Sequence, residues 1–174
     1  GDLAGALDDC ERGLDIAPND ATLVRTRGMV RARQQKPEAL ADLDRAIELD
    51  PTEPQAWLLR GIIHAARGNL EAAASDLTRS VQLGPRNVMA RSMLAQAKLR
   101  QGLLDQALEH ASAAVTLAPT NGEAWLVRGV VKLRLGDLSG EKDLERGIEL
   151  DPTAKEAPEA RRVLEKIRGA REKR

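Results

Sequence analysis

Few side chains in this sequence have the chemistry of a catalytic or metal-binding group. The two histidines, His64 and His110, and the single cysteine, Cys10, are far apart in the chain. A histidine can act as a base or a metal ligand, and a cysteine as a nucleophile. The spacings that build a nucleotide loop, a zinc site or a calcium loop are absent. We therefore expect no enzyme activity, no metal and no cofactor, with both histidines as packing residues and Cys10 in the core.

Arginine and aspartate recur in matched positions. Three arginines each precede a glycine and are followed 15 or 16 residues later by an aspartate, giving the pairs Arg27 and Asp42, Arg60 and Asp76, and Arg128 and Asp143. In one further segment both positions change together, to Leu94 and His110. Such a row of charges could bind a ligand. We favour structural ion pairs, because a partly buried charge that has lost its partner is costly.

Prolines divide the chain into units of 33 or 34 residues, at Pro18, Pro51, Pro85, Pro119 and Pro152. Apolar residues recur at helical spacing within 54–66 and 70–83, and Gly68 interrupts the chain between these two segments. Each unit therefore reads as two helices, with the proline after the second one. Residues that favour helix N-termini stand just beyond three of the prolines, at Asp20, Asn87 and Asn121.

This pattern resembles the tetratricopeptide repeat, a unit of about 34 residues with a tryptophan, a glycine, a small residue and a closing proline at fixed places. One segment carries Trp57, Gly61, Ala73 and Pro85 in this order, and another carries Trp125 with its own glycine and proline. The resemblance implies an all-α fold, an α-solenoid of antiparallel helix pairs wound into a right-handed superhelix. It also implies bacterial-type repeats, which the Ala-, Leu- and Arg-rich composition supports.

The repeat phase predicts ten helices in a single array. The expected parts are a half repeat at 1–20, full repeats at 21–53, 54–87, 88–121 and 122–154, and a capping helix with a basic tail at 155–174. Thr153 and Glu156 have the spacing of a capping box, and Pro158 predicts a kink or a late start of the last helix. Because the chain begins in mid-repeat, the first apolar stripe is expected to lack part of its cover, which predicts a homodimer through residues 1–16 or a fraying helix.

Composition excludes several classes of function. The 27 basic and 27 acidic residues balance, which argues against binding to nucleic acid or to an anionic membrane surface. Trp57 and Trp125 are the only aromatic residues, too few for a base-stacking platform. The chain has no apolar run of the roughly 18 residues that a membrane span needs. With no signal peptide at its start, a cytoplasmic location is expected.

In a superhelix of helix pairs the first helix of each pair lines a concave surface. We therefore expect an apolar, Arg-edged groove that binds a protein or peptide segment, formed by Arg25, Met29, Arg33, Leu58, Leu59, Ile62, Met89, Met93, Gln96, Arg100, Leu126, Val127, Val130 and Arg134. Family members that clamp the acidic tails of chaperones use Lys and Asn there, and these positions have neither. The arginines could instead meet acidic groups beside an apolar peptide. The alternatives are a self-assembly module or a regulatory part of a larger enzyme.

Overall fold

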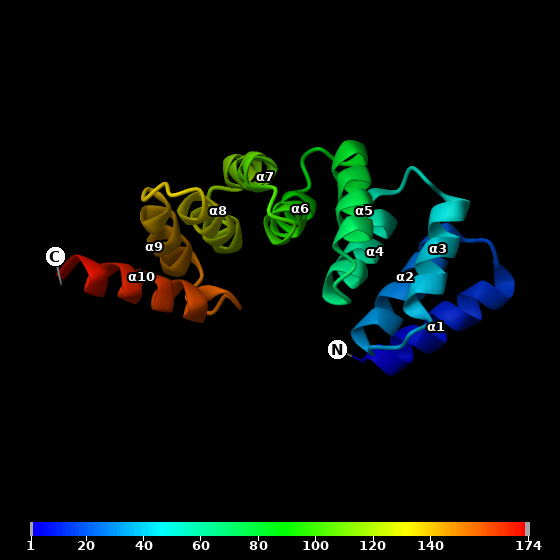
Figure 1. Ribbon diagram of the computed structural model, residues 1–174. Coiled ribbons are helices and arrows are strands. Elements are labelled where there is room, and N and C mark those ends of the chain that lie inside the picture. Colours follow the sequence, from blue (N-terminus) through cyan, green and yellow to red (C-terminus); the bar gives the residue numbers. More distant parts are fainter. Residues whose placement is uncertain (1, 173–174) are drawn as a thin grey trace. The chain divides into compact units, whose positions relative to one another are not determined.

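The computed structural model describes residues 2–172, and over these residues the regular elements are ten α-helices (Figure 1). Residues 1, 173 and 174, the last two in the predicted basic tail, lie outside that range. The helices are α1 (Leu3–Ile16), α2 (Ala21–Arg33), α3 (Ala39–Leu49), α4 (Pro54–Ala66), α5 (Leu70–Leu83), α6 (Val88–Arg100), α7 (Leu104–Leu117), α8 (Gly122–Arg134), α9 (Gly140–Leu150) and α10 (Ala157–Glu172). The chain forms two compact units, unit 1 (Gly1–Pro85) with α1–α5 and unit 2 (Arg86–Arg174) with α6–α10.

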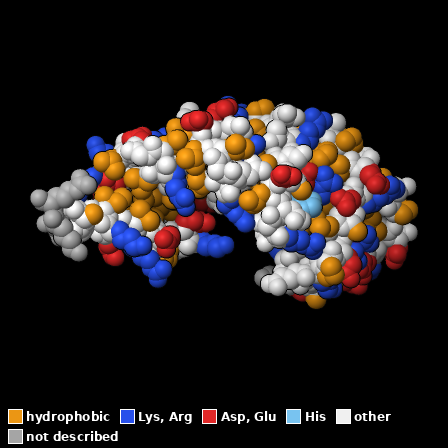
Figure 2. All heavy atoms as spheres, viewed as in Figure 1, with side chains coloured by type: hydrophobic (Ala, Val, Ile, Leu, Met, Phe, Trp, Pro, Cys, Tyr) orange, Lys and Arg blue, Asp and Glu red, His pale blue; other side chains and the backbone are white. Residues whose placement is uncertain are grey.

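The helix pairs confirm the all-α solenoid. We call the first helix of each repeat an A helix (α2, α4, α6, α8) and the second a B helix (α3, α5, α7, α9). Each A helix packs against its own B helix, and within each unit neighbouring A helices also touch, α2 with α4 and α6 with α8. In Figure 2, basic and acidic side chains are interspersed over the visible face of unit 1, as expected for a chain without net charge.

The A helices begin where the sequence predicts. The side chain of Asp20 accepts a hydrogen bond from the Leu23 amide at 2.9 Å, which satisfies one of the unpaired amides in the first turn of α2. Asn87 and Asn121 do the same for α6 and α8, each at 3.0 Å. The helix α4 is capped by Glu53 instead, whose carboxylate accepts from the Gln55 amide at 2.9 Å.

Glycine lets the chain reverse between three of the A and B helices. Gly68, Gly102 and Gly136 have φ angles of 83°, 78° and 82°, in the left-handed region that side chains with a Cβ rarely enter. Between α2 and α3 the same conformation is taken by Gln35, with φ 57°. The turn is therefore a fixed part of the repeat, even in the repeat that has no glycine there.

Small residues allow the two helices of a repeat to approach closely. A Cβ added at Gly61 would lie 2.9 Å from Cγ of Leu77, a side chain with no exposed surface. The matching position in α6 is Ala95, which is also fully buried. The apolar core thus follows the contact line between A and B helices, as the periodicity predicted.

Each tryptophan ties an A helix to the turn before it. The indole Nε1 of Trp57 donates to the carbonyl oxygen of Pro51 at 3.0 Å, and that of Trp125 donates to Pro119 at 2.8 Å. Both proline carbonyls lie six residues before the ring. The tryptophan and the closing proline of the preceding repeat are therefore one structural device.

The last helix starts late, which confirms one of the two outcomes expected from Pro158. The helix α10 begins at Ala157, with Pro158 in its first turn, where a missing amide costs little. The predicted capping box is wrong, because the Thr153 hydroxyl and amide both bind the carboxylate of Asp151, at 2.9 and 3.0 Å. An aspartate two residues upstream captures the threonine in a local turn before the helix starts.

The first helix is better covered than the sequence predicted. Cys10 is 5% exposed and Leu14 is 8% exposed, and the side chain of Gln34 donates to the Leu3 carbonyl at 3.3 Å. The end of the stripe is covered by two helices, since Leu14 lies in a cluster with Val24 of α2 and with Ala46 and Ile47 of α3. Among the large apolar side chains described in α1, Ile16 remains in solvent and is 88% exposed.

Candidate functional site

The predicted arginine–aspartate pairs form within single repeats. Nε and Nη2 of Arg60 donate to the two carboxylate oxygens of Asp76 at 2.8 and 2.7 Å. Arg128 holds Asp143 in the same two-bond geometry, at 2.6 and 2.8 Å. Both aspartates are 4% exposed, so each is buried with its charge satisfied. The structural interpretation of these charges is confirmed.

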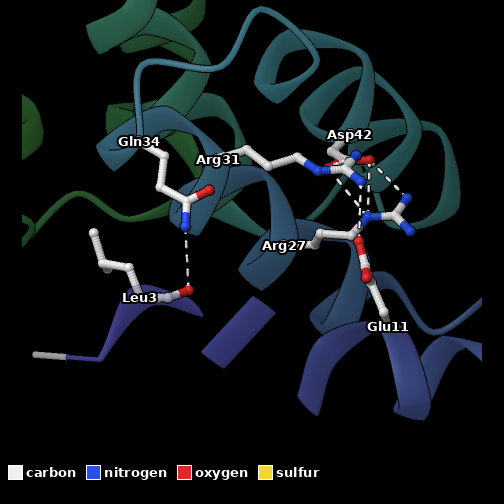
Figure 3. A network of polar contacts seen from close by, with 6 residues as sticks. All are labelled: Leu3, Glu11, Arg27, Arg31, Gln34 and Asp42. Carbon is white, nitrogen blue, oxygen red and sulfur yellow. Dashed lines mark hydrogen bonds and ion pairs between the residues drawn. The ribbon is translucent and has the colours of Figure 1, made fainter. Parts of the chain in front are cut away.

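A second basic residue, which the sequence analysis missed, lies beside each aspartate. Arg31 contacts Asp42 at 2.8 Å beside Arg27, and Figure 3 shows both guanidinium groups turned toward this carboxylate. Arg31 also reaches Glu11 of α1 at 3.4 Å, which links α1 to the network. The signal was present in the sequence, since the second basic residue stands four residues after the arginine and so on the same face of the A helix.

The same position is occupied in the two other repeats with an aspartate. Lys132 Nζ lies 3.0 Å from Asp143, and His64 Nε2 lies 4.0 Å from Asp76. We call the arginine, the aspartate and this second basic residue the polar layer of a repeat. Where the repeat has a tryptophan, its ring covers the arginine, with the guanidinium carbon of Arg60 5.0 Å from the centre of the Trp57 ring.

The repeat formed by α6 and α7 has no such carboxylate. Leu94 is 1% exposed, and His110 takes the place of the aspartate, with its Nδ1 buried and without a hydrogen-bond partner among the described residues. Burial lowers the pKa of His110; the charge of Glu109 opposes this shift, and Arg91 and Lys98 lower the pKa further. The net shift favours the neutral imidazole, as expected for a packing residue.

The remaining reactive side chains are also placed for packing. Burial raises the pKa of the Cys10 thiol, which keeps it protonated and unreactive. Among the described residues there is no cluster of three or more His, Cys, Asp or Glu side chains that could hold a metal ion. The polar layers stabilise the hairpins, and the groove expected from the sequence involves the A helices.

Four predicted groove residues come together in one pocket of unit 1. Met29 and Arg33 of α2 and Leu59 and Ile62 of α4 line a pocket of about 460 Å³. The complete lining is Met29, Ala32, Arg33, Gln35, Lys36, Ala39, Leu59, Ile62, Ile63, Ala66 and Arg67. The sequence analysis missed Lys36 and Arg67 because it considered only the faces of the A helices, whereas these two stand at the A–B turns.

Three of the predicted groove residues belong to the core instead. Leu58, Leu126 and Val127 are 2%, 1% and 4% exposed, so they offer no surface to a partner. Val127 packs against Ala95 and Ala111 of the preceding repeat. The packing face of an A helix is thus wider than the sequence analysis assumed.

The capping helix accounts for two of the corrections in α8. Leu126 lies in a cluster with Leu144 of α9 and Leu164 of α10. Val130 packs against the same cluster and is half-buried. The helix α10 therefore covers part of the face that was expected to bind a peptide.

The other predicted groove residues differ in how far their side chains are exposed to solvent. Met89 is 57% exposed, and Arg100 and Arg134 are exposed at the ends of their helices. Met93 is half-buried, as is Arg25, which lines a small separate cavity with Asp50 and Glu53.

A polar bridge crosses the corresponding part of unit 2. The side chain of Gln96 donates to the carboxylate of Glu123 at 3.3 Å, linking α6 to α8. Burial raises the pKa of Glu123, and the charge of Glu156 raises it further. This surface therefore differs in chemistry from the apolar pocket of unit 1.

The repeated pairs of antiparallel helices define the chain as an α-solenoid built from helix hairpins. Two sequence-family models, both described as tetratricopeptide repeat, match residues 31–98 and 92–155. The chain belongs to the tetratricopeptide repeat family. None of its described helices is long and apolar enough to cross a membrane.

Solved structures with the same fold include MamA (41-end) from Desulfovibrio magneticus RS-1, with a TM-score of 0.77 at 20% identity over 89% of this chain and 89% of that one. YrrB, a tetratricopeptide repeat protein with an unusual peptide-binding site, gives 0.74 at 21% identity over 92% and 84%. The first tetratricopeptide repeat unit of Spaghetti (RPAP3), bound to the HSP90 peptide SRMEEVD, gives 0.62 at 26% identity over 68% and 94%.

Proposed function

We propose that this chain is a non-catalytic scaffold that binds a peptide or helical segment of another protein on the A helices. The observation that carries the proposal is the pocket of unit 1, where Met29, Arg33, Leu59 and Ile62 converge from two A helices. An apolar concavity with charged groups at its edge is the usual form of a recognition site. Two proteins of the same fold, YrrB and Spaghetti, are described with a peptide-binding site and a bound peptide.

A displayed library of random peptides, selected against the purified chain, tests this proposal. Enriched peptides are then measured against Leu59→Glu, which places a charge on the pocket wall, and against Leu138→Glu as a matched control. Leu138 is 60% exposed and lies outside the pocket, so its substitution changes the same side-chain chemistry elsewhere. We expect Leu59→Glu to abolish binding with unchanged helical content, and Leu138→Glu to bind normally. Equal binding by both variants would move the site away from this pocket.

Self-association through residues 1–16 is a second candidate function. It is favoured by Ile16, which is 88% exposed on α1, and opposed by the burial of Cys10 and Leu14 within unit 1. Light scattering over a range of concentrations separates the two functions. A constant monomer mass supports the peptide-binding scaffold. A mass that grows with concentration, and that returns to the monomer mass in the variant Ile16→Asp, supports assembly.

A further inference from the structure

The pocket of unit 1 has an apolar wall and a basic rim. Its wall consists of Met29, Leu59, Ile62 and Ile63 with three alanines, and its volume of about 460 Å³ exceeds that of any single apolar side chain. The flexible side chain of Met29 can adjust to a branched ligand group. The interior therefore fits one or two aliphatic side chains of a bound segment.

The rim carries three cations. Arg33 ends α2, Lys36 stands in the turn that follows, and Arg67 is the C-cap of α4. None of the described residues that line the pocket is acidic. The helix C-termini explain why basic residues are favourable here, but they do not explain why no carboxylate faces them.

These three cations also differ from the arginines nearby. Arg27 and Arg60, on the same two helices, are each held by a buried aspartate. By contrast, the side chains of Arg33, Lys36 and Arg67 form no hydrogen bond or ion pair with any residue in the described range 2–172. The pocket thus presents unneutralised positive charge around an apolar concavity, in a chain whose total charge is zero.

From this charge pattern, and resting on the proposed scaffold function, we propose that the pocket binds a segment of another protein in which an aliphatic side chain is flanked by aspartate or glutamate. The aliphatic group enters between α2 and α4. Its flanking carboxylates pair with Arg33, Lys36 and Arg67, where a guanidinium can bind a carboxylate through two hydrogen bonds. The occupant is recognised by its charge pattern rather than by a free C-terminal carboxylate.

The test uses three blocked peptides and ¹⁵N-labelled protein. The first has a central leucine between two aspartates on each side, the second replaces the aspartates with lysines, and the third replaces the leucine with serine. We expect the first alone to shift the amide signals of Met29, Leu59 and Ile62. Its affinity should fall about tenfold or more when the salt concentration is raised from about 0.05 to 0.5 M, as charge screening requires.

A charge reversal supplies the decisive variant. Both Arg33 and Arg67 are exposed, so Arg33→Glu/Arg67→Glu should fold normally, lose the aspartate peptide and gain the lysine peptide. Arg86 is exposed and does not line the pocket, so Arg86→Glu is the matched charge reversal and should leave binding unchanged.

Three outcomes would overturn the proposal. The aspartate peptide could shift signals of α8 instead, in which case the pocket is wrong and the scaffold function stands. The aspartate peptide could shift neither the pocket signals nor the α8 signals, while peptides selected from the library still depend on Leu59. In that case the proposed charge pattern is wrong. Finally, the pocket signals could shift with protein concentration alone as the mass doubles, in which case the occupant is a second copy of the chain.

Discussion

The hairpins α4–α5 and α6–α7 share one backbone design but differ in the chemistry between their helices. The first holds Arg60 and Asp76 in a two-bond ion pair, and the second has Leu94 and His110 in the same positions. Both keep a small residue where the helices cross, Gly61 in one and Ala95 in the other. Small residues and buried apolar side chains are therefore sufficient to set the register of the hairpin. The polar layer is an addition, and it must be complete or absent because a buried charge without its partner is costly.

The largest effect should come from breaking a complete polar layer. Asp76→Ala leaves Arg60 and His64 without their shared carboxylate in a mostly buried position. We expect the free energy of unfolding to fall by about 2–4 kcal/mol, less than for a fully buried pair. Arg60 keeps some contact with solvent, and its Nη1 still donates to the carboxylate of Asp44 in α3 at 2.7 Å. Urea unfolding followed by circular dichroism measures it. The control, His110→Ala in the other hairpin, should cost clearly less, and equal losses would contradict the comparison.

Removing the indole donor should have the next largest effect. Trp57→Phe keeps an aromatic ring over Arg60 but loses the hydrogen bond to the Pro51 carbonyl. We expect a loss of about 1–2 kcal/mol. The parallel variant Trp125→Phe should show a similar loss, and thermal midpoints of both variants measured side by side would reveal any difference.

Converting one hairpin into the chemistry of the other sharpens the comparison. The double variant Arg60→Leu/Asp76→Leu replaces the ion pair by apolar side chains, as Leu94 does in α6. We expect a change within about 1 kcal/mol of the wild type, and thus a smaller loss than for Asp76→Ala alone. A double variant as unstable as the single one would show that the ion pair itself sets the register.

The smallest effect concerns pH. Burial lowers the pKa of His110 in the folded chain, so the unfolded chain binds the proton more readily and stability falls as the pH drops below the ordinary histidine range. His110→Gln should remove this part of the loss between pH 7.5 and 5.5. Burial raises the pKa of Glu123, which acts in the opposite direction at lower pH, so the measurement stays above pH 5.5. A pH dependence identical in both proteins would rule out His110 as its source.

The sequence predicted the hairpins because their determinants are local. The closing prolines, the turn glycines such as Gly68 and the caps such as Asn87 each act within a few residues of their position. The pair Arg60 and Asp76 was also predictable, because its absence from one repeat showed that the two residues vary as a unit.

The binding surface was predicted less well, because it depends on contacts between repeats. Helical spacing placed Leu126 and Val127 on the free face of α8, but neighbouring helices, α10 among them, cover both. Conversely, Lys36 and Arg67 belong to turns, and only the packing of α2 beside α4 brings them to the rim of one pocket. Periodicity describes one helix at a time and carries no information on which neighbour covers it.

The tryptophans have a practical consequence. The chain has no tyrosine and no phenylalanine, and Trp57 lies in unit 1 while Trp125 lies in unit 2. Each indole is held by a hydrogen bond that is lost when its own turn opens. The chain therefore carries one intrinsic fluorophore for each unit, and the single-tryptophan variants report separately on how each half melts, without any added dye.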